Sequence, residues 1–221
     1  MKREDFIATI RARLGRGIAE PVPEHLSSRS PTKRSRAELV LCFGAELSRV
    51  GGALHRVTST AALESALIDF ARAFEVRSGV GFGKSCFERF ELARLWREVA
   101  ISCWERGSES CGASFRARCA AADIGISVAD LGVAASGSML FLVDAARPRA
   151  VTLLPRSHVA ILTADALVPD LAAAMEFIAA RGAPPSSALF ITGPSRTSDI
   201  ENDLTLGVHG PAAVTVFLLD N

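Results

Sequence analysis

The amino-acid sequence predicts an α/β protein with a mostly parallel β-sheet, helices on both faces of that sheet and an antiparallel portion. Three short, nearly uncharged segments are typical of strands buried on both sides, at residues 138–144, 158–163 and 214–219. Segments with the helical spacing of apolar residues lie before and between such strands. This alternation is the pattern of a sheet that is covered by helices.

The first 34 residues differ from the rest of the chain. A short amphipathic helix is predicted over residues 2–14 from four apolar residues at helical spacing, namely Phe6, Ile7, Ile10 and Leu14. Pro21, Pro23 and Pro31 follow in a weakly hydrophobic, exposed stretch. We therefore expect an N-terminal helix and linker arm over residues 1–34 and one α/β domain over residues 35–221. The pattern leaves open whether the helix packs on its own domain or on a second copy in a homodimer.

From residue 35 onward, predicted helices and strands alternate. The elements expected up to residue 121 are a helix over residues 35–50 that ends at Gly51-Gly52, a strand at 55–58, and helices over 60–74, 85–97 and 112–121. Later elements are a strand at 124–128, a helix over 165–181 with Asp165 as N-cap and Gly182 as C-cap, a strand at 188–192 and a helix over 195–204. The segments 138–144, 149–154 and 159–163 lie too close together for crossover helices, so we expect the antiparallel portion there.

The composition argues against several classes of protein. Of the 221 residues, 49% are hydrophobic and 22% are charged, as in an ordinary globular domain. The 25 basic and 24 acidic residues leave a net charge of +1, so no strong field attracts nucleic acid or an anionic membrane. The apolar segments are far shorter than a membrane span, and the charged N-terminal segment lacks the apolar core of a signal peptide. We expect a cytoplasmic protein.

The cysteines do not form a metal-binding pattern. None belongs to a Cys-x-x-Cys pair, and the closest neighbours are eight residues apart among Cys42, Cys86, Cys103, Cys111 and Cys119. Structural zinc sites and iron–sulfur clusters usually use closely spaced thiolates. We therefore expect free, mostly buried thiols and no metal or cofactor bound by this chain.

A glycine-rich segment at residues 78–85 (SGVGFGKS) nearly matches the phosphate-binding P-loop GxxxxGK[ST]. In that interpretation Lys84 binds the outer phosphate and Ser85 binds magnesium. However, Ser78 occupies the position of the first glycine, and residues 74–77 make a poor buried strand because Glu75 and Arg77 interrupt it. The alternative is a glycine-rich turn that opens a helix capped by Ser85.

The C-terminal region contains the strongest candidate for a binding site. The strand predicted at 188–192 leads into GPSRT and a predicted helix, and a strand-to-helix turn at the carboxyl edge of a sheet is where α/β proteins bind ligands. Arg196 suits a carboxylate or phosphate. His209 lies between two glycines in an open loop that suits proton transfer. The alternative is that these residues only cap a helix and pair on a solvated face.

Two aspartates and one histidine have simpler explanations as well. Asp123 and Asp130 flank the strand at 124–128, where they are candidates to orient a histidine or bind a cation. As ordinary turn residues they would bond their own backbone. His158 opens an apolar strand, which is typical of a structural histidine.

Four segments carry a resemblance to a known family. Residues 122–138 (ADIGISVADLGVAASGS) resemble ADIGITxADxGIAETGT, and residues 153–160 (LLPRSHVA) resemble LLPxxHIA. Residues 191–201 (ITGPSRTSDIE) and 206–211 (LGVHGP) are similar to ITGPSRTADIE and LGVHGP. On these segments, which follow in order over about the last hundred residues, the chain resembles the LUD domain family of the LutC/YkgG, lactate-utilization type.

The resemblance implies a NagB/RpiA/CoA-transferase-like fold and a role in the oxidation of L-lactate to pyruvate. It also implies partner subunits of the LutA and LutB type that carry the iron–sulfur clusters, while this chain binds a small organic anion. The residues to which we assign ligand binding are Ser136, Gly137, Ser138, Gly193, Pro194, Ser195, Arg196, Thr197, Asp199, Glu201, Gly207, His209 and Gly210, with His209 the candidate for catalysis.

One departure from the family pattern bears on the chemistry. Where the family has AETGT, this chain has AASGS, so Ala135 replaces the acidic residue. A mechanism that needs that carboxylate as base or nucleophile is put in doubt. The alternative function is a stand-alone enzyme of the same fold that acts on a phosphorylated sugar, a folate or an acyl-CoA.

Overall fold

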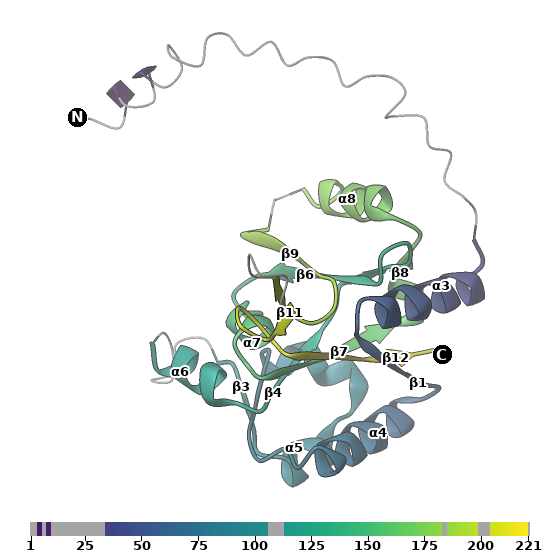
Figure 1. The fold of residues 1–221 in the computed structure, drawn as a ribbon, viewed down its shortest axis with the longest axis vertical. Helices are drawn as coiled ribbons and strands as arrows, with labels where there is room; N and C mark the ends of the chain where they lie inside the picture. Colours follow the sequence, from purple (N-terminus) through teal and green to yellow (C-terminus); the bar gives the residue numbers. More distant parts are fainter. Residues whose placement is uncertain are drawn as a thin grey trace. The chain divides into compact units, whose positions relative to one another are not determined.

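A computed structural model of the chain describes residues 4–5, 8–9, 34–105, 113–182, 185–198 and 204–220. The chain divides into two units, Met1–Lys33 and Arg34–Asn221. Only four residues of the first unit are described, so the predicted N-terminal helix and linker lie almost entirely outside the described residues. All of the elements named below belong to the second unit (Figure 1).

The main sheet has six strands that all run parallel. Its order is β1-β12-β7-β4-β2-β3. The strands are β1 (Ala53–Val57), β2 (Gly79–Gly81), β3 (Ile101–Cys103), β4 (Ile124–Val128), β7 (Ser157–Thr163) and β12 (Ala213–Leu219).

A second sheet contains the antiparallel portion. Its order is β8-β5-β6-β9, in which β6 is antiparallel to both of its neighbours. These strands are β5 (Leu131–Val133), β6 (Ser138–Val143), β8 (Leu167–Val168) and β9 (Ser187–Ile191). A two-stranded antiparallel hairpin of β10 (Arg196–Ser198) and β11 (Leu204–Leu206) completes the described strands.

The helices follow local signals in the sequence. Ser35 accepts a hydrogen bond from the Glu38 backbone while Glu38 accepts one from the Ser35 backbone, which forms a capping box at the start of α3. Ser59 caps α4 by accepting a hydrogen bond from the Ala62 N–H, without a reciprocal side-chain bond. The helical elements are α3 (Arg36–Arg49), α4 (Thr60–Ala73), the 3₁₀ helix η1 (Lys84–Phe90), α5 (Ala93–Glu98), α6 (Ala113–Ala121), α7 (Ala150–Leu153), the 3₁₀ helix η2 (Ala164–Ala166) and α8 (Leu171–Ala179).

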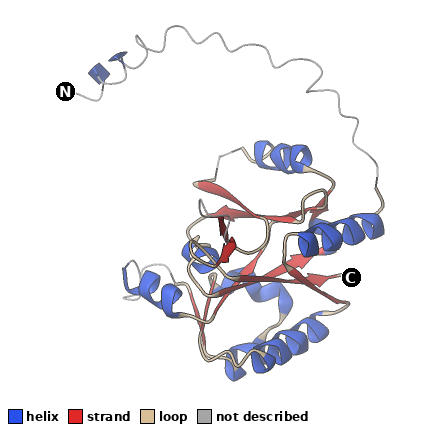
Figure 2. Cartoon of the chain, in the orientation of Figure 1, coloured by secondary structure: helices blue, strands red, loops and turns tan. Residues whose placement is uncertain are grey.

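The two faces of the main sheet are covered by different layers (Figure 2). Phe217 of β12 meets Phe70 of α4 at 5.8 Å between ring centroids, so α4 covers one face. His158 of β7 is paired with Val214 of β12, so these two side chains point to the same face. Val214 is three residues from Phe217, and side chains alternate along a strand, so both point to the face opposite Phe217. There the His158 ring lies 5.4 Å from that of Phe141 in β6, which places the second sheet on this face.

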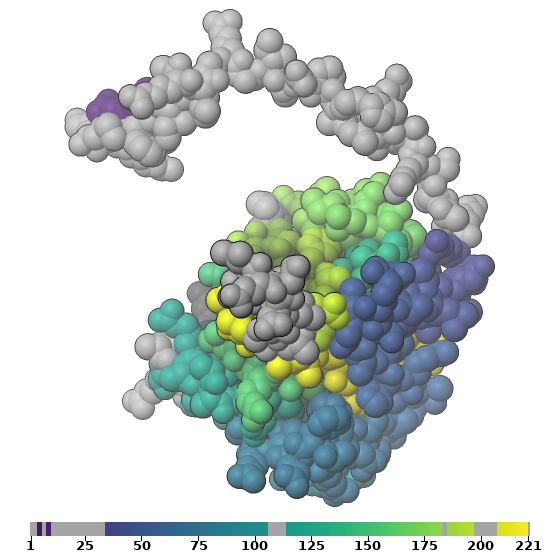
Figure 3. All heavy atoms as spheres, in the orientation of Figure 1, coloured from purple at the N-terminus to yellow at the C-terminus, as the bar shows by residue number. Residues whose placement is uncertain are grey.

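Strand β6 separates two apolar cores. Met139 and Phe141 belong to the large core against the main sheet, whereas Leu140 and Leu142 pack with Ala174 of α8. Successive side chains of β6 thus point alternately into the two cores, as expected for a strand that lies between two layers. The space-filling view shows α3 and α8 as parts of the molecular surface (Figure 3). The predicted α/β class, with a mostly parallel sheet and an antiparallel portion, is therefore confirmed.

The predicted helix over residues 165–181 is wrong in its first part. η2 and β8 occupy residues 164–168, and α8 begins only after Asp170, whose carboxylate accepts from the Ala173 N–H at 3.0 Å. The physical reason is Pro169, which has no N–H to donate inside a helix. Asp165 is therefore not the N-cap.

Two other helix predictions also need correction. The segment at 85–97 is divided into η1 and α5, because Glu91 takes a left-handed conformation with φ of 52°. The segment at 195–204 contains no described helix: residues 196–198 form β10, in which Thr197 is paired with Thr205.

The P-loop interpretation is contradicted by β2. Gly79 to Gly81 form a buried strand of the main sheet, between β4 and β3. The Gly79 and Gly83 N–H groups donate to the Ala100 and Ala146 carbonyls, so they are not free to bind phosphates. Ser85 is not the cap either, since η1 begins at Lys84 after Gly83.

The antiparallel portion includes β6, one of the three predicted segments, but the partners of β6 are β5 and β9 rather than the two segments that follow it. Residues 150–153 form α7 rather than a strand, and β6 and β7 belong to different sheets. No crossover helix is needed between strands that are not in the same sheet. No helix among the described residues is long and apolar enough to cross a membrane.

Candidate functional site

A pocket of about 300 Å³ lies where β4 and β7 end, at the carboxyl edge of the main sheet. Its lining includes Asp130 from the β4–β5 turn, Thr163 at the end of β7 and Asp165 of η2. Three arginines and one cysteine from other elements complete its polar lining: Arg89, Arg147, Arg181 and Cys86. We call this the carboxyl-edge pocket. It has the position at which open α/β sheets bind ligands.

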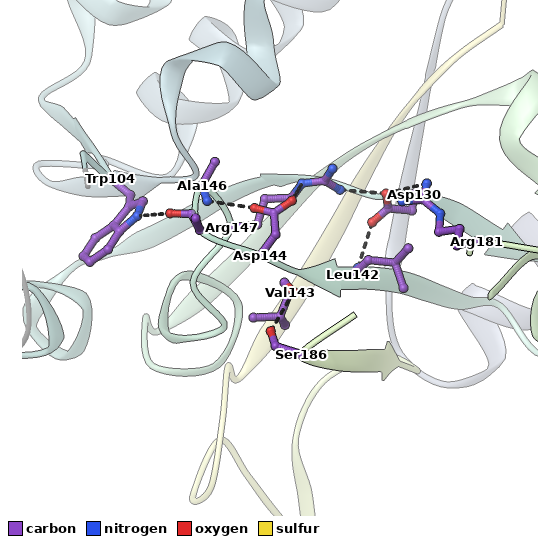
Figure 4. Close-up of polar contacts among 10 residues, drawn as sticks. Trp104, Asp130, Leu142, Val143, Asp144, Ala146, Arg147, Arg181 and Ser186 are labelled. Atoms are coloured by element: carbon purple, nitrogen blue, oxygen red, sulfur yellow. Dashed lines mark hydrogen bonds and ion pairs between the residues drawn. The ribbon is translucent and has the colours of Figure 1, made fainter. Parts of the chain in front are cut away.

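Asp130 is the centre of the polar contacts at this pocket (Figure 4). Its side chain is only 7% exposed. One carboxylate oxygen accepts from Arg147 Nη1 at 2.6 Å, and the other accepts from the Leu142 N–H at 2.8 Å. Arg181 Nη2 lies 4.0 Å from the same carboxylate. The buried charge is therefore paired and hydrogen-bonded, as burial demands.

Arg147 is held between two carboxylates. Besides Asp130, its Nε lies 3.1 Å from Asp144, which in turn accepts from the Ala146 N–H (Figure 4). Burial disfavours the charged form, but the hydrogen bond to Asp130 and the charges of both aspartates outweigh it, so the pKa of Arg147 is raised. Arg147 is thus a fixed cation at the pocket.

Arg89 and Arg181 supply further positive charge. The Arg181 guanidinium lies over the Phe177 ring at 4.8 Å, and the Arg89 guanidinium lies over the Phe90 ring at 4.7 Å. Three guanidinium groups thus face two carboxylates, Asp130 and Asp165, in the pocket lining. Such a balance suits the carboxylate of a small organic acid.

Cys86 contributes a thiol rather than a thiolate. Burial raises the pKa of its Sγ, and Asp144 raises it further, while Arg147 opposes the effect. The nucleophilic form of cysteine is the thiolate, so Cys86 is not an activated nucleophile.

A second cavity, of about 490 Å³, lies at the other end of the strands, where β1, β12, β7 and β4 begin. We call this the amino-edge cavity. Asp123 lines it and accepts hydrogen bonds from the Arg77 and Ser78 N–H groups and from Ser78 Oγ. These bonds lower the pKa of Asp123. Asp123 thus bonds a neighbouring loop and lies away from Asp130.

The predicted GPSRT and GVHGP loops lie at this amino edge, not at the carboxyl edge of the main sheet. They connect β9 to the start of β12, and of their residues Pro194 and Arg196 line the amino-edge cavity. The Ser195 N–H donates to the Pro211 carbonyl, and the Gly207 N–H donates to Ser195. The two loops are therefore hydrogen-bonded to each other.

The glycines of these loops have structural roles. Gly193 has φ of 77° and packs against Val50, where a Cβ would lie 2.8 Å from the carbonyl oxygen. Gly207 also has a positive φ, and Gly210 packs on Ser195. Arg196 donates to the Val50 carbonyl at 2.5 Å.

His209 is exposed and lines neither of the two cavities. The backbone of Thr197 is described, but its side chain is not, and Asp199 and Glu201 lie outside the described residues. The catalytic assignment of His209 therefore stays a prediction.

The serine loop forms a separate hydroxyl cluster. Ser136 Oγ lies 2.8 Å from Ser138 Oγ, which lies 2.7 Å from Thr192 Oγ1. Gly137, with φ of 65°, packs against the backbone of α3 at Glu46 and Leu47. Ala135, at the position where the family pattern has an acidic residue, is exposed.

His158 is fully buried, as a structural histidine would be. Its Nε2 lies 2.7 Å from Ser127 Oγ, whereas its Nδ1 has no hydrogen-bond partner within the described part of the chain. Burial lowers the pKa of His158 to about 3, so the ring is neutral at physiological pH.

Sequence reasoning identified Asp130 but missed the arginines around it. Arg147 follows β6, Arg181 follows α8 and Arg89 lies in η1, so only folding brings them together. No spacing in the sequence links three single arginines separated by 34 to 58 residues.

Within the described ranges, no group of three His, Cys, Asp or Glu side chains is placed to hold a metal ion. Cys42, Cys86, Cys103 and Cys119 are free thiols, and Cys111 lies outside these ranges.

Most of the chain is similar to proteins that are already known. The LUD domain family model matches residues 43–219. The chain is 27% identical to lactate utilization protein C 1 of Bacillus mycoides, over 99% of this chain and 97% of that protein. It is 30% identical to lactate utilization protein C of Shouchella clausii, over 72% of this chain and 69% of that protein.

A solved structure has the same fold. It is the crystal structure of a DUF162 family protein from Deinococcus radiodurans, which matches with a TM-score of 0.61 and 20% identity. The match covers 85% of this chain and 99% of that one. Similarity at this level of identity concerns the fold alone.

Proposed function

The chain belongs to the LUD domain family, and we propose that it takes part in lactate utilization as a subunit that binds a small organic anion. Relatives named lactate utilization protein C align with nearly its whole length, which supports the same role for this chain. The reaction to which the role belongs is the oxidation of L-lactate to pyruvate. Both of these compounds are small carboxylates.

The single observation that carries the anion-binding proposal is the set of three arginines in the carboxyl-edge pocket. Arg147 is already bound by Asp130 and Asp144, so it sets the local charge rather than holding the ligand. Arg89 and Arg181 stack on phenylalanine rings, which leaves guanidinium N–H groups to donate to a ligand carboxylate. Arg181 is the residue we expect to contribute most, because it lies 4.0 Å from Asp130 whereas Arg147 is hydrogen-bonded to that carboxylate at 2.6 Å, so Arg181 is the more loosely paired of the two.

The size of the pocket favours a small acid. At about 300 Å³ it is at the lower end of the range of roughly 300–1,000 Å³ for small-molecule sites. Thr163 is buried at the end of β7 and lines the pocket, so its hydroxyl is available to a ligand hydroxyl or carbonyl. A three-carbon hydroxy acid or keto acid matches these groups.

We further propose that the electrons of the oxidation pass through partner subunits. The sequence of this chain has no closely spaced thiolate pair, and iron–sulfur clusters are usually held by such pairs. Cluster-bearing partners of the LutA and LutB type would supply that chemistry. Co-expression followed by affinity purification tests this part: the partners should be retained, and a chain whose loss leaves growth on L-lactate unchanged has no such role.

Isothermal titration calorimetry with L-lactate and with pyruvate tests the anion site. Replacement Arg181→Gln removes one charge-assisted contact and should weaken binding about tenfold, which corresponds to about 1.4 kcal/mol. Arg72→Gln is the matched control, because Arg72 is an exposed arginine that pairs with Glu98 on another surface. Equal affinities for the two variants, or no heat of binding from either acid, would overturn the proposal.

A further inference from the structure

We propose that the amino-edge cavity binds an organic anion that carries a planar aromatic ring. This inference goes beyond the proposed function, because it concerns a different cavity at the opposite end of the parallel strands. The cavity measures about 490 Å³, against about 300 Å³ for the carboxyl-edge pocket. It is therefore large for a three-carbon acid and suits a ligand with a ring system.

The apolar part of the cavity is aromatic. Phe70 and Phe74 lie in the last turn and at the C-cap of α4, with their ring centroids 4.5 Å apart. Phe70 packs inward on Phe217, whereas Phe74 is 69% exposed. An exposed phenylalanine beside a cavity offers a ring face or edge to a ligand, and aromatic pairs contribute about 0.5–1.5 kcal/mol beyond the buried area.

The charged part of the cavity is cationic. Arg156, from the segment between α7 and β7, and Arg196, at the start of β10, both line it. Arg196 is held in place by its hydrogen bond to the Val50 carbonyl. The only carboxylate in the described lining is Asp123, and it already accepts three hydrogen bonds from residues 77 and 78. Two guanidinium groups thus face one carboxylate that is largely satisfied.

These two properties together define the class of ligand. A small carboxylate would leave Phe74 and Val76 in water, and a neutral apolar compound would leave two guanidinium groups with Asp123 as the one carboxylate of the described lining. A compound with one ring system and one anionic group satisfies both sets of side chains, because arginine binds anions and phenylalanine binds rings.

The test compares two fluorescent probes that differ by one charge. 8-Anilinonaphthalene-1-sulfonate has the ring system and a sulfonate, whereas N-phenyl-1-naphthylamine has the same rings without the charge. With the full chain, Phe74→Ala should weaken binding of both probes at least fivefold. Arg156→Gln should weaken the sulfonate at least fivefold and leave the neutral probe within twofold.

Leu171→Ala is the matched control, because Leu171 is an apolar residue of α8 that is 55% exposed away from the cavity. It should leave both affinities unchanged. If Phe74→Ala affects the probes no more than Leu171→Ala, or if Arg156→Gln weakens both probes equally, the proposal is wrong. Should Phe74→Ala fail to fold, the response of the two probes to Arg156→Gln decides by itself.

Titration of L-lactate into the same variants separates this site from the proposed function. Phe74→Ala and Arg156→Gln should bind L-lactate as the unsubstituted chain does, since neither residue lines the carboxyl-edge pocket. Loss of L-lactate binding in both variants would show that the two cavities are not independent sites and would overturn the inference.

Discussion

Two substitutions of Asp130 should separate the contributions of its two contacts to stability, namely the ion pair with Arg147 and the hydrogen bond from the Leu142 N–H. Asp130→Ala removes the ion pair and also leaves the Leu142 N–H, inside the second core, without an acceptor. Asp130→Asn removes the charge but keeps an oxygen that accepts from Leu142. The difference between these two variants therefore reports the backbone hydrogen bond, and the cost of Asp130→Asn reports the ion pair.

The expected magnitudes follow from burial. An unsatisfied buried N–H costs about 1–3 kcal/mol. Breaking a fully buried pair costs about 3–5 kcal/mol, but Arg147 is partly exposed and keeps Asp144, so we expect about 1–2 kcal/mol from the charge. Asp130→Ala should thus lower the free energy of unfolding by about 2–5 kcal/mol, the sum of both costs, and Asp130→Asn by about 1–2 kcal/mol.

Urea denaturation followed by circular dichroism measures these changes. Asp144→Asn is the matched control: it is the other carboxylate on Arg147, but its side chain is 50% exposed, so its loss should cost less than about 1 kcal/mol. The reasoning fails if Asp130→Asn costs no more than Asp144→Asn. It also fails if Asp130→Ala and Asp130→Asn are equally stable.

Two further predictions concern buried positions. Burial lowers the pKa of His158 from 6.5 to about 3, so as the pH falls below 6.5 the unfolded chain binds a proton that the folded chain does not. The free energy of unfolding should be insensitive to this group above pH 6.5 and should fall by up to about 1.4 kcal/mol per pH unit below it. Denaturation between pH 5 and 6.5 tests this, and an identical slope in His158→Gln would contradict it. Gly137→Ala should destabilise the fold by about 2–5 kcal/mol, because φ is 65° and the new Cβ would lie 2.4 Å from the Leu47 nitrogen. Gly182→Ala, where nothing lies within 4 Å, should change the unfolding temperature little, and equal shifts for the two glycine variants would refute the argument.

The parts of the fold that the sequence predicts are those set by local patterns. The helix α3 has its capping box at Ser35 and its glycine stop at Gly51, and both signals are complete within the segment itself. The strands β6, β7 and β12 are continuous apolar segments, so their burial is evident from composition. These elements are confirmed within one or two residues.

The errors arise where tertiary contacts or a single residue outweigh the pattern. Pro169 interrupts an otherwise helical segment, and its effect is visible in the sequence once the missing N–H is considered. By contrast, two of the three residues of β2, Gly79 and Gly81, have little strand preference. It is a strand because Gly79 fits between the side chains of Ile101 and Ile124, and Gly81 between those of Cys103 and Ile126.

The candidate site shows the same division. Asp130 is recognisable because it follows a buried strand, and that position points to the sheet edge. Its partner Arg147 is not recognisable, because the contact is made across a turn between sheets. The GPSRT and GVHGP loops were assigned to the wrong edge, because β9 belongs to the second sheet and the chain then returns to the start of β12.

Strand β4 also sets a rule for how this chain can vary. Asp123 and Asp130 stand just outside its two ends, so the length of one buried strand of five residues sets the separation of a carboxylate in each cavity. An insertion or deletion of one residue in Ile124–Val128 would turn the later side chains of this strand to the opposite face. Changes in length among related sequences should therefore fall in the connecting loops, and the seven-residue interval between the aspartates should remain constant.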